Sequence, residues 1–339
     1  MRYLLALALT IPALFAAGGY RLLKTIPFGA APGDREYFDY INVDSATRRV
    51  YLSHGTEFLV VDADKGTLLG KITGTRRNHG VALVPDLNRG FITDGDAAQI
   101  VVFDLKTFQA IGEIKGEPDA DSILYDSVSK RVFVFNGDPS SATVIDPAKS
   151  SIIATLPLGG SPEQAVADGK GMIYANLAST NEVIALDARS LKIASRFPTA
   201  PVGHPVSISM DRKTRRLFIG GRDPKLFAMM NADSGKIIGD AFPIGARVDS
   251  NIFDDDLKIA ACSTGDGTIH IFHEDSPDKL TLVESVKTEF GAKTMGLDAK
   301  THHLLVDTSD FEPGTPTAKQ PHPQPRAKPG TLRLLIYGK

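Results

Sequence analysis

Residues 121–137 read DSILYDSVSKRVFVFNG: an apolar run, a polar turn that carries a basic residue, and a second apolar run that ends at a glycine. The same pattern returns at residues 39–55 (DYINVDSATRRVYLSHG), 79–95 (HGVALVPDLNRGFITDG) and 206–221 (VSISMDRKTRRLFIGG). Three more copies open at Glu163, Asp249 and Lys293. Short runs of β-branched and aromatic residues between polar turns are typical of antiparallel strands. The chain therefore contains seven copies of one strand–turn–strand unit.

Most copies continue with a third apolar run and a fourth. Residues 57–72 read EFLVVDADKGTLLGKI, and residues 99–114, 141–156 and 182–197 follow the same pattern. The third run ends at Asp62, Asp104, Asp146 and Asp187, which are 42, 42 and 41 residues apart. An aspartate at a tight turn accepts backbone N–H groups, so we interpret these side chains as structural. The same interpretation covers the aspartates in the first turn of the copies: Asp44, Asp126, Asp168, Asp211, Asp254 and Asp298.

A four-stranded unit that repeats about every 40–44 residues is the signature of a β-propeller blade. The sequence therefore predicts an all-β, seven-bladed propeller with four antiparallel strands per blade, formed by residues 20–339 as a single domain. The seventh copy stops one strand short, and residues 22–28 (LLKTIPF) have the pattern of a fourth strand. We expect this N-terminal strand to complete the last blade, because an open ring would expose a sheet edge.

The first 19 residues have the layout of a cleavable export signal. One positive charge at Arg2 precedes an apolar run of about 15 residues and then small residues, which is short for a membrane span. We expect cleavage between Ala16 and Tyr20, which gives an exported protein without a stable membrane span, periplasmic or alternatively secreted. Cys262 is the only cysteine, which excludes internal disulfides in that compartment.

Composition excludes some classes of function. The formal net charge is −2, from 38 Lys and Arg against 40 Asp and Glu, which gives no support to nucleic-acid binding through a basic excess. The sequence has no GxSxG nucleophile turn, no HExxH zinc motif and no glycine-rich phosphate loop before a helix. No catalytic residue is therefore predicted, and we expect a monomer.

The repeat resembles the YVTN/YncE-type seven-bladed propellers of exported bacterial proteins. The resemblance rests on the second runs at residues 49–53 (RVYLS), 131–136 (RVFVFN) and 171–176 (GMIYAN), each followed by a third run, and it covers residues 22–337. Blades five and six depart from it, because Asn231 and His273 stand where the turn aspartate is expected. The resemblance implies the propeller fold and an exported protein, and it implies little about activity. WD-repeat and quinoprotein propellers match less well, since the chain has no tryptophan.

Ionisable residues occupy the start of the first strand in six of the seven copies. The equivalent positions are Asp39, His79, Asp121, Glu163, Val206, Asp249 and Lys293, spaced by 40, 42, 42, 43, 43 and 44 residues. In a propeller these positions surround one mouth of the channel. Tyr37, Arg77, His204 and Arg247 lie two residues earlier in their copies, and His54 ends a second strand. This set is our candidate ligand-binding site.

Two interpretations of this ring compete. The side chains are either a solvated rim or a concave site in which unlike charges bind a ligand. The first functional hypothesis is a non-catalytic propeller that binds a small polar ligand or a protein partner, without a cofactor. The alternative is a metal-dependent hydrolase of lactonase type, in which Asp39, His79, Asp121, Glu163, His204 and Asp249 hold one divalent cation that activates water. A haem-bearing propeller is a third possibility, for which only His79 and His204 qualify as ligands.

Residues 310–330 form an insert between the second and third strands of blade seven. The insert holds six of the 21 prolines, which predicts an extended and mobile segment over the channel mouth. It is either a lid or tether for a partner, or a passive loop.

Overall fold

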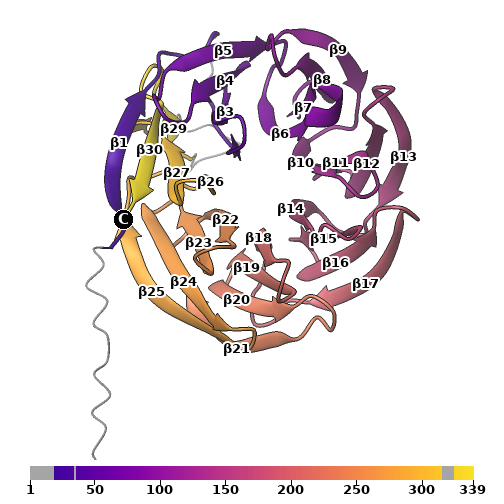
Figure 1. The fold of residues 1–339 in the computed structure, drawn as a ribbon, viewed down its shortest axis with the longest axis vertical. Helices are drawn as coiled ribbons and strands as arrows, with labels where there is room; N and C mark the ends of the chain where they lie inside the picture. Colours follow the sequence, from indigo (N-terminus) through magenta and orange to yellow (C-terminus); the bar gives the residue numbers. More distant parts are fainter. Residues whose placement is uncertain (1–18, 34–35, 315–323) are drawn as a thin grey trace, which may run out of the picture.

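The computed structural model describes residues 19–33, 36–314 and 324–339. Seven four-stranded antiparallel sheets stand around a central channel, which confirms the predicted seven-bladed propeller (Figure 1). Apart from Gly19, the predicted export signal lies outside the described residues. No helix in the described ranges is long and apolar enough to cross a membrane.

In each blade, four strands follow one another from the channel outward. Blades one to three consist of β2 (Ile41–Asp44), β3 (Arg49–His54), β4 (Glu57–Asp62), β5 (Leu68–Thr73), β6 (Asn78–Val84), β7 (Arg89–Asp94), β8 (Gln99–Asp104), β9 (Ala110–Lys115), β10 (Ala120–Asp126), β11 (Arg131–Asn136), β12 (Ser141–Asp146) and β13 (Ser151–Pro157), with the short 3-10 helix η1 (Pro85–Leu87) after β6. Blades four to six consist of β14 (Pro162–Ala167), β15 (Met172–Leu177), β16 (Glu182–Asp187), β17 (Lys192–Pro198), β18 (Pro205–Asp211), β19 (Arg216–Arg222), β20 (Lys225–Asn231), β21 (Ile237–Pro243), β22 (Val248–Asp254), β23 (Ile259–Thr264), β24 (Thr268–Ser276) and β25 (Lys279–Lys287).

Blade seven joins the two ends of the chain. It contains β26 (Met295–Asp298), β27 (His303–Thr308), β30 (Arg333–Gly338) and, as its outer strand, β1 (Arg21–Pro27). β1 pairs antiparallel with β30, with Leu22 opposite Tyr337 and Ile26 opposite Leu334. The predicted closure by the N-terminal strand is therefore confirmed, and each blade has its fourth strand.

The hydrophobic core lies between neighbouring blades. Strands two and three are buried on both faces, so they are nearly continuous apolar runs, whereas the outer strands are largely exposed. Aromatic stacks join blades five and six: the ring of Phe218 lies 4.9 Å from that of Phe253, and the ring of Phe227 lies 4.4 Å from that of Phe272. Cys262 is fully buried in the same cluster.

Aspartate side chains hold the turns, as the sequence predicted. The Oδ1 atom of Asp62 accepts hydrogen bonds from the backbone N–H groups of Asp64 and Lys65, at 3.0 and 2.8 Å. In blade five, Asn231 accepts two backbone N–H groups in the same way. The amide oxygen of asparagine replaces the carboxylate oxygen as acceptor, which explains why this departure from the repeat leaves the turn intact.

The aspartates of the first turns have a second role that the repeat alone did not indicate. On the face opposite the channel mouth, they pair with a basic residue of the following blade, just before its second strand. The pairs are Asp168–Arg215 at 3.1 Å, Asp211–Lys258 at 2.9 Å, Asp254–His302 at 2.8 Å and Asp298–Arg48 at 2.6 Å. The last pair links blade seven to blade one, so it fastens the closing point of the ring.

Replacing Arg48 by methionine is expected to lower the free energy of unfolding by about 3 kcal/mol, because it leaves the buried carboxylate of Asp298 without its cationic partner. The Asp298 side chain is only 4% exposed and that of Arg48 is 15% exposed. Burial raises the pKa of Asp298, but the hydrogen bond from Arg48 outweighs burial and holds that pKa well below its ordinary value. The stabilisation is therefore fully present above about pH 4, the pKa of an aspartate in the unfolded chain, and declines as the pH falls below that value.

Urea unfolding at pH 7 and at pH 3 checks this prediction, and the difference between Arg48→Met and the unchanged chain should shrink at pH 3. Lys130→Met is the matched control, because its partner Asp86 is exposed and such pairs contribute about 0–1 kcal/mol. Equal effects of the two substitutions at pH 7 would contradict the expected role of Arg48.

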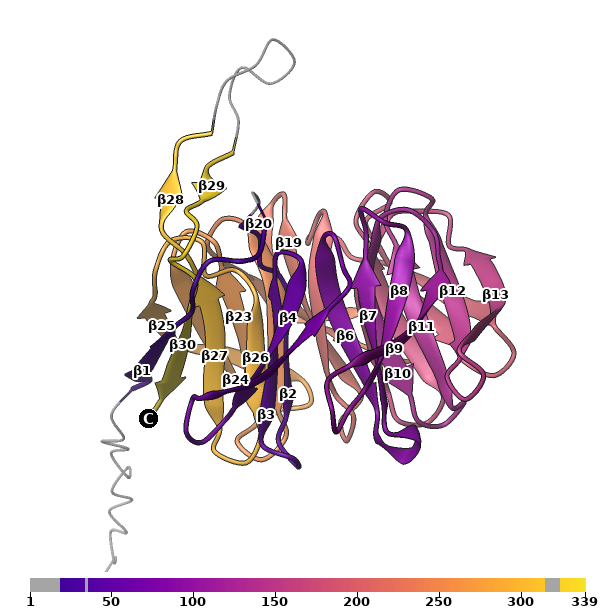
Figure 2. The same cartoon turned by 90° about the horizontal axis from the view of Figure 1, so that it is seen from above.

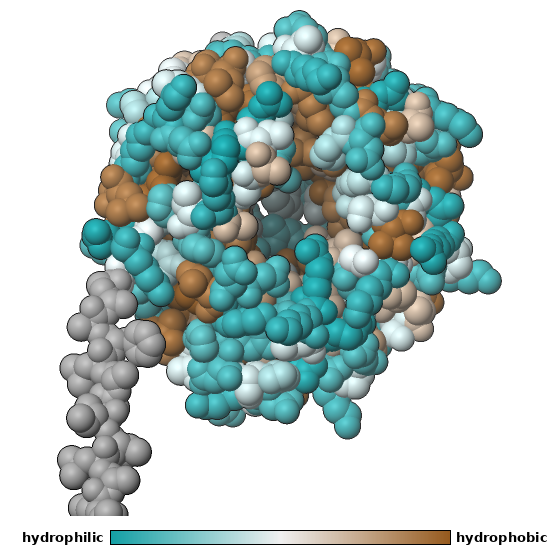
Figure 3. Space-filling model, in the orientation of Figure 1, coloured by the Kyte–Doolittle hydropathy of each residue, from teal (hydrophilic) through white to brown (hydrophobic). Residues whose placement is uncertain are grey.

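The described part of the predicted insert rises from blade seven, at one side of the ring (Figure 2). Its base is a two-stranded ribbon of β28 (Phe311–Glu312) and β29 (Arg326–Ala327). Phe311 anchors this ribbon, with its ring 6.3 Å from that of Phe38 and 5.2 Å from that of Phe290. The base of the insert is therefore paired and packed, which the proline-rich composition did not predict; residues 315–323 lie outside the described ranges. Figure 3 shows the opposite face of the ring, away from the insert; this face is largely hydrophilic, and the channel opens at its centre.

Candidate functional site

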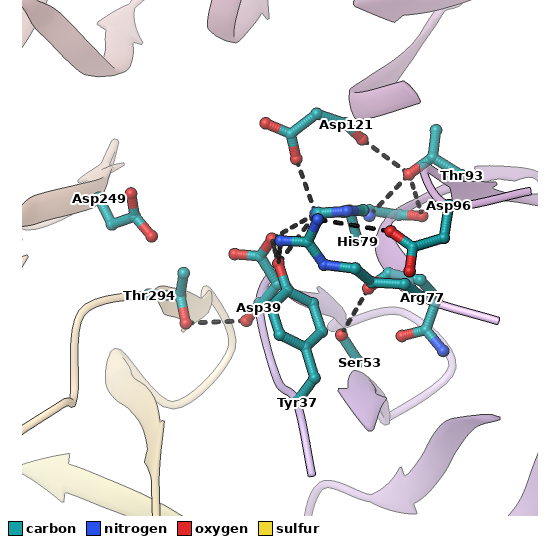
Figure 4. Close-up of polar contacts among 12 residues, drawn as sticks. Tyr37, Asp39, Ser53, Arg77, His79, Thr93, Asp96, Asp121, Asp249 and Thr294 are labelled. Carbon is teal, nitrogen blue, oxygen red and sulfur yellow. Dashed lines mark hydrogen bonds and ion pairs between the residues drawn. The ribbon is translucent and has the colours of Figure 1, made fainter. Parts of the chain in front are cut away.

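Three side chains from neighbouring blades meet at the channel mouth (Figure 4). Asp39 precedes β2, His79 lies in β6 and Asp121 lies in β10, so each stands at the inner strand of its own blade. The Nδ1 atom of His79 lies 2.7 Å from Oδ2 of Asp39 and 3.1 Å from Oδ1 of Asp121. We call these three residues the aspartate–histidine cluster.

Tyr37 closes the cluster from one side. Its hydroxyl donates to Oδ2 of Asp39 at 2.8 Å and lies 3.0 Å from Nδ1 of His79. The guanidinium of Arg77 lies over the Tyr37 ring, 4.5 Å from its centroid. Polar side chains from three adjacent blades thus meet in one cluster. Local sequence patterns alone do not bring these side chains together.

Opposite charges shift the pKa values within the cluster. Burial favours neutral His79, but its hydrogen bonds with Asp121 and Asp39 outweigh burial and raise its pKa to about 10. Burial alone would raise the pKa of Asp39, but Lys293 and His79 outweigh burial and hold that pKa well below its ordinary value. Burial raises the pKa of Asp121.

Asp249 is held by two cations on the other side of the channel. Lys293 and Arg222 both donate to its carboxylate, and the Nζ atom of Lys293 also lies 3.6 Å from Oδ1 of Asp39. Lys293 therefore bridges the first strands of blades six and one. The negative charge of Asp249, one of the acidic residues predicted for the site, is thus neutralised by Lys293 and Arg222.

Glu163 forms no hydrogen bond or ion pair with any other described residue. Burial raises its pKa to about 8, and the carboxylate of Asp121 adds to this shift. Tyr40 lies nearby: burial and the carboxylates of Asp121 and Asp39 raise the pKa of its phenol well above the usual range. Both groups are therefore mainly neutral at pH 7.

A cavity of about 940 Å³ lies between the ring and the base of the insert. Its described lining comprises five cationic residues, two acids, three aromatic residues and several small or neutral ones: Arg77, Arg222, Arg247, Lys293 and Arg326; Glu36 and Glu312; Tyr37, Phe38 and Phe311; and Gly291, Gln324, Pro325, Ala327 and Pro329. Arg247 lies over the Phe290 ring, 4.5 Å from its centroid, and donates to the carbonyl of Gly265 at 2.7 Å. The mouth is thus cationic and partly aromatic, although the chain as a whole is nearly neutral.

The structure brings most of the predicted site residues together and leaves two apart. The residues that gather at the mouth are Tyr37, Asp39, Arg77, His79, Asp121, Glu163, Asp249 and Lys293, with Arg247 on the cavity wall. His54 is buried elsewhere, with its Nε2 atom 2.6 Å from Glu36. His204 lies beside Arg222 and Asp223, and burial lowers its pKa. No described contact joins either histidine to the aspartate–histidine cluster.

The sequence analysis missed Arg222, Tyr40 and the insert residues Phe311 and Arg326. Strand β19 runs to Arg222, two residues beyond Gly220, the position equivalent to the ends of the other second strands. The short connection at Asp223–Pro224 between β19 and β20 is the signal that could have placed Arg222 at the mouth. Phe311 and Arg326 carry no repeat signal, because the insert occurs once.

The haem alternative does not fit the position of His79. Its Nδ1 atom is enclosed by Asp39, Asp121 and Tyr37. Its Nε2 atom is buried against Gly95, where even a Cβ atom would lie only 3.0 Å away. Neither ring nitrogen therefore has room for a haem iron.

Sequence comparison finds relatives for part of the chain only. Two curated proteins described as "Uncharacterized protein YncE", from Salmonella typhimurium and Salmonella typhi, are 28% identical over 104 residues. The match covers 30% of this chain and 29% of the length of each relative. No protein-family model matches the chain.

Solved structures with the same fold are distant in sequence. A chain of hydrazine synthase from Kuenenia stuttgartiensis has a TM-score of 0.69 at 13% identity and covers 81% of this chain and 94% of its own length. The structure of U3-55K has a TM-score of 0.73 at 11% identity and covers 93% of this chain and 98% of its own length. A chain of the mitotic checkpoint complex has a TM-score of 0.73 at 15% identity and covers 100% of this chain and 99% of its own length. At these identities the likeness shows the fold alone. The sequence match shows similarity to the YncE proteins over part of the chain, and the ring of seven blades shows the propeller fold.

Proposed function

We propose that this chain is an exported, non-catalytic propeller that binds a small anionic molecule in the cavity at the channel mouth. The charge of the described lining supports this choice, with five cationic residues against two acids. One of those acids, Glu36, is directed to His54 at 2.6 Å and to the backbone N–H of Ala31 at 3.2 Å. Its charge is therefore engaged within the wall.

The position of Arg247 carries the proposal. Arg222 and Lys293 are already paired with Asp249, whereas the guanidinium of Arg247 has no carboxylate partner among the described residues. It is held on the Phe290 ring and on the carbonyl of Gly265 at the cavity wall. A guanidinium fixed in this way is suited to a carboxylate or phosphate group, which it can bind through two parallel N–H groups.

The aromatic lining indicates the rest of the ligand. Tyr37, Phe38 and Phe311 offer an apolar surface beside the cationic residues. We therefore expect an anion with an apolar or aromatic body rather than a small inorganic ion. A cavity of about 940 Å³ has the size usual for such ligands.

The test is binding of phenyl phosphate and benzoate by calorimetry in the presence of a chelator, with benzyl alcohol and benzylamine as the neutral and cationic probes. We expect the two anions to bind and the other two probes not to bind. Arg247→Gln should weaken binding of the anions about 10–100-fold, because a charge-assisted hydrogen bond contributes about 1.5–3 kcal/mol. Higher salt should weaken binding further.

Lys192→Gln is the control variant, because Lys192 is exposed at the start of β17 in an outer strand. It should leave the affinity unchanged. Anion binding that survives Arg247→Gln at full strength, or equal binding of benzylamine, would overturn the proposal. A protein that binds none of the four probes would also overturn it, and would favour the protein-partner form of the hypothesis instead.

One observation keeps the metal-dependent hydrolase as a second candidate. Asp39, His79 and Asp121 offer ligand atoms that all lie within 4.8 Å of one another. Two of the remaining members, Asp249 and His204, do not join them, since Asp249 is bound by Lys293 and Arg222 and His204 lies apart. Metal-dependent hydrolysis of a lactone by the purified protein, lost on chelation, would replace the binding proposal with this one.

A further inference from the structure

We propose that the aspartate–histidine cluster is a binding site for one divalent transition-metal ion, with Asp39, His79 and Asp121 as its ligands. The three donor atoms lie within 4.8 Å of one another. Nδ1 of His79 lies 2.7 and 3.1 Å from the two carboxylate oxygens. Adjacent ligands around an octahedral ion with bonds of about 2.1 Å are separated by about 3.0 Å, so the spacing fits a small cation. The cluster shares Tyr37 with the wall of the anion cavity, but the proposal does not require an anion to bind there.

Hydrogen bonds alone do not satisfy this group. Three oxygens surround Nδ1 of His79, from Asp39, Asp121 and Tyr37, yet a ring nitrogen carries at most one proton. The Tyr37 hydroxyl also has one proton, and it donates to Asp39. Oδ1 of Asp121 is buried 3.1 Å from Nδ1 of His79, and among the described residues it has no donor except the one proton of that nitrogen, for which Asp39 competes. A cation between these atoms satisfies all of them, which is the usual reason for such an arrangement.

The charge of the groups around the channel mouth favours a cation. Four carboxyl groups stand at the starts of the inner strands, and Lys293 and Arg222 supply two positive charges by pairing with Asp249. A bound cation favours the ionised form of every carboxyl group near it. With the carboxylates ionised and His79 neutral, as a metal ligand must be, the negative charges at the mouth outnumber the positive charges of Lys293, Arg222 and Arg77. This excess of negative charge attracts a cation.

The donor set selects the kind of metal. One imidazole nitrogen and two carboxylates, with a phenol oxygen alongside, suit Zn²⁺ or Mn²⁺. Ca²⁺ prefers six to eight oxygen ligands, which this cluster does not offer. Each ligand comes from a different blade: His79 and Asp121 lie on inner strands and Asp39 lies just before β2, so the packing of three blades sets the separation of the donors.

The test uses the full purified chain, stripped with a chelator and dialysed against Zn²⁺, Mn²⁺ or Ca²⁺. We expect one Zn²⁺ or Mn²⁺ per chain by metal analysis and at most weak binding of Ca²⁺. At a metal concentration of 100 times Kd, the ratio of folded to unfolded protein should rise about 100-fold, which a shift in Tm reports.

Asp121→Asn keeps the shape of the side chain and removes its charge, and it should weaken metal binding at least about tenfold. His302→Gln is the matched control, since it removes a histidine from a histidine–aspartate pair on the opposite face and should leave binding unchanged. Absence of stoichiometric metal, or equal binding by Asp121→Asn, would overturn the proposal. Because the anion titrations are run with a chelator present, their failure and the failure of the metal site are distinguishable.

Discussion

A chain that begins at Phe28, and so lacks β1, is expected to lose its cooperative unfolding transition and to aggregate. β1 is the outer strand of blade seven and pairs with β30 along six residue positions, from Arg21 to Pro27. Without it, β30 becomes an open edge that offers unpaired N–H and C=O groups to other chains. The ring would also lose the strand pairing that joins the two ends of the chain. We expect the loss to exceed about 5 kcal/mol, which is the whole stability of a marginal domain.

Size-exclusion chromatography and urea unfolding measure this result. The informative control is a permuted chain in which residues 20–27 follow Lys339 through a short glycine linker. Because Arg21 lies opposite Gly338 in the antiparallel pair, this connection forms a hairpin between β30 and β1. The permuted chain should regain the elution volume of the intact chain and most of its stability. A deletion variant that unfolds like the intact chain would show that closure contributes little.

Replacement of Phe227 by alanine is the second change with a large expected effect. Phe227 is fully buried in β20, and its ring stacks at 4.4 Å on that of Phe272 in the next blade. Alanine removes the transfer free energy of the ring and leaves a cavity between blades five and six. We expect the free energy of unfolding to fall by about 3–5 kcal/mol.

Chemical unfolding checks this value, and Phe227→Leu serves as the comparison that keeps most of the volume. The leucine variant should lose less than about 1.5 kcal/mol, because most of the space stays filled. Phe290→Ala is the matched control, since the ring of Phe290 is 48% exposed and its removal should cost less than that of a core ring. If Phe290→Ala and Phe227→Ala lose the same stability, the large effect does not arise from the packing between blades.

The sequence predicted the blades because each blade is encoded locally. An apolar run, a polar turn with its aspartate and a second apolar run are enough to specify two paired strands, as residues 121–137 show. The repeat also predicted closure, since the last copy lacks a strand that residues 22–28 can supply. The same equivalence of positions brought Asp39, His79 and Asp121 into one candidate set.

The equivalent positions of the repeat did not predict which of these side chains are in contact with one another. His204 occupies a position related to the others, yet Asn181 binds its backbone N–H and its ring stays beside Arg222. His54 ends a second strand, yet Glu36 holds it within the wall. In both cases a neighbouring residue, Asn181 or Glu36, determines where the histidine lies. Neither neighbour occupies one of the equivalent positions of the repeat, so the repeat could not predict these contacts.

The sequence by itself determined the number of blades, their strand order and the strand that closes the ring, because these follow from short-range patterns of hydrophobicity and turns. Only the tertiary structure decided that Lys293 bridges Asp249 and Asp39, that Arg222 reaches the mouth and that Asp121 shares His79 with Asp39. These contacts join residues 27 to 254 positions apart. The energy of these contacts depends on distances of a few ångströms between side chains of different blades. The packing of the blades sets those distances, and the spacing of residues along the chain does not.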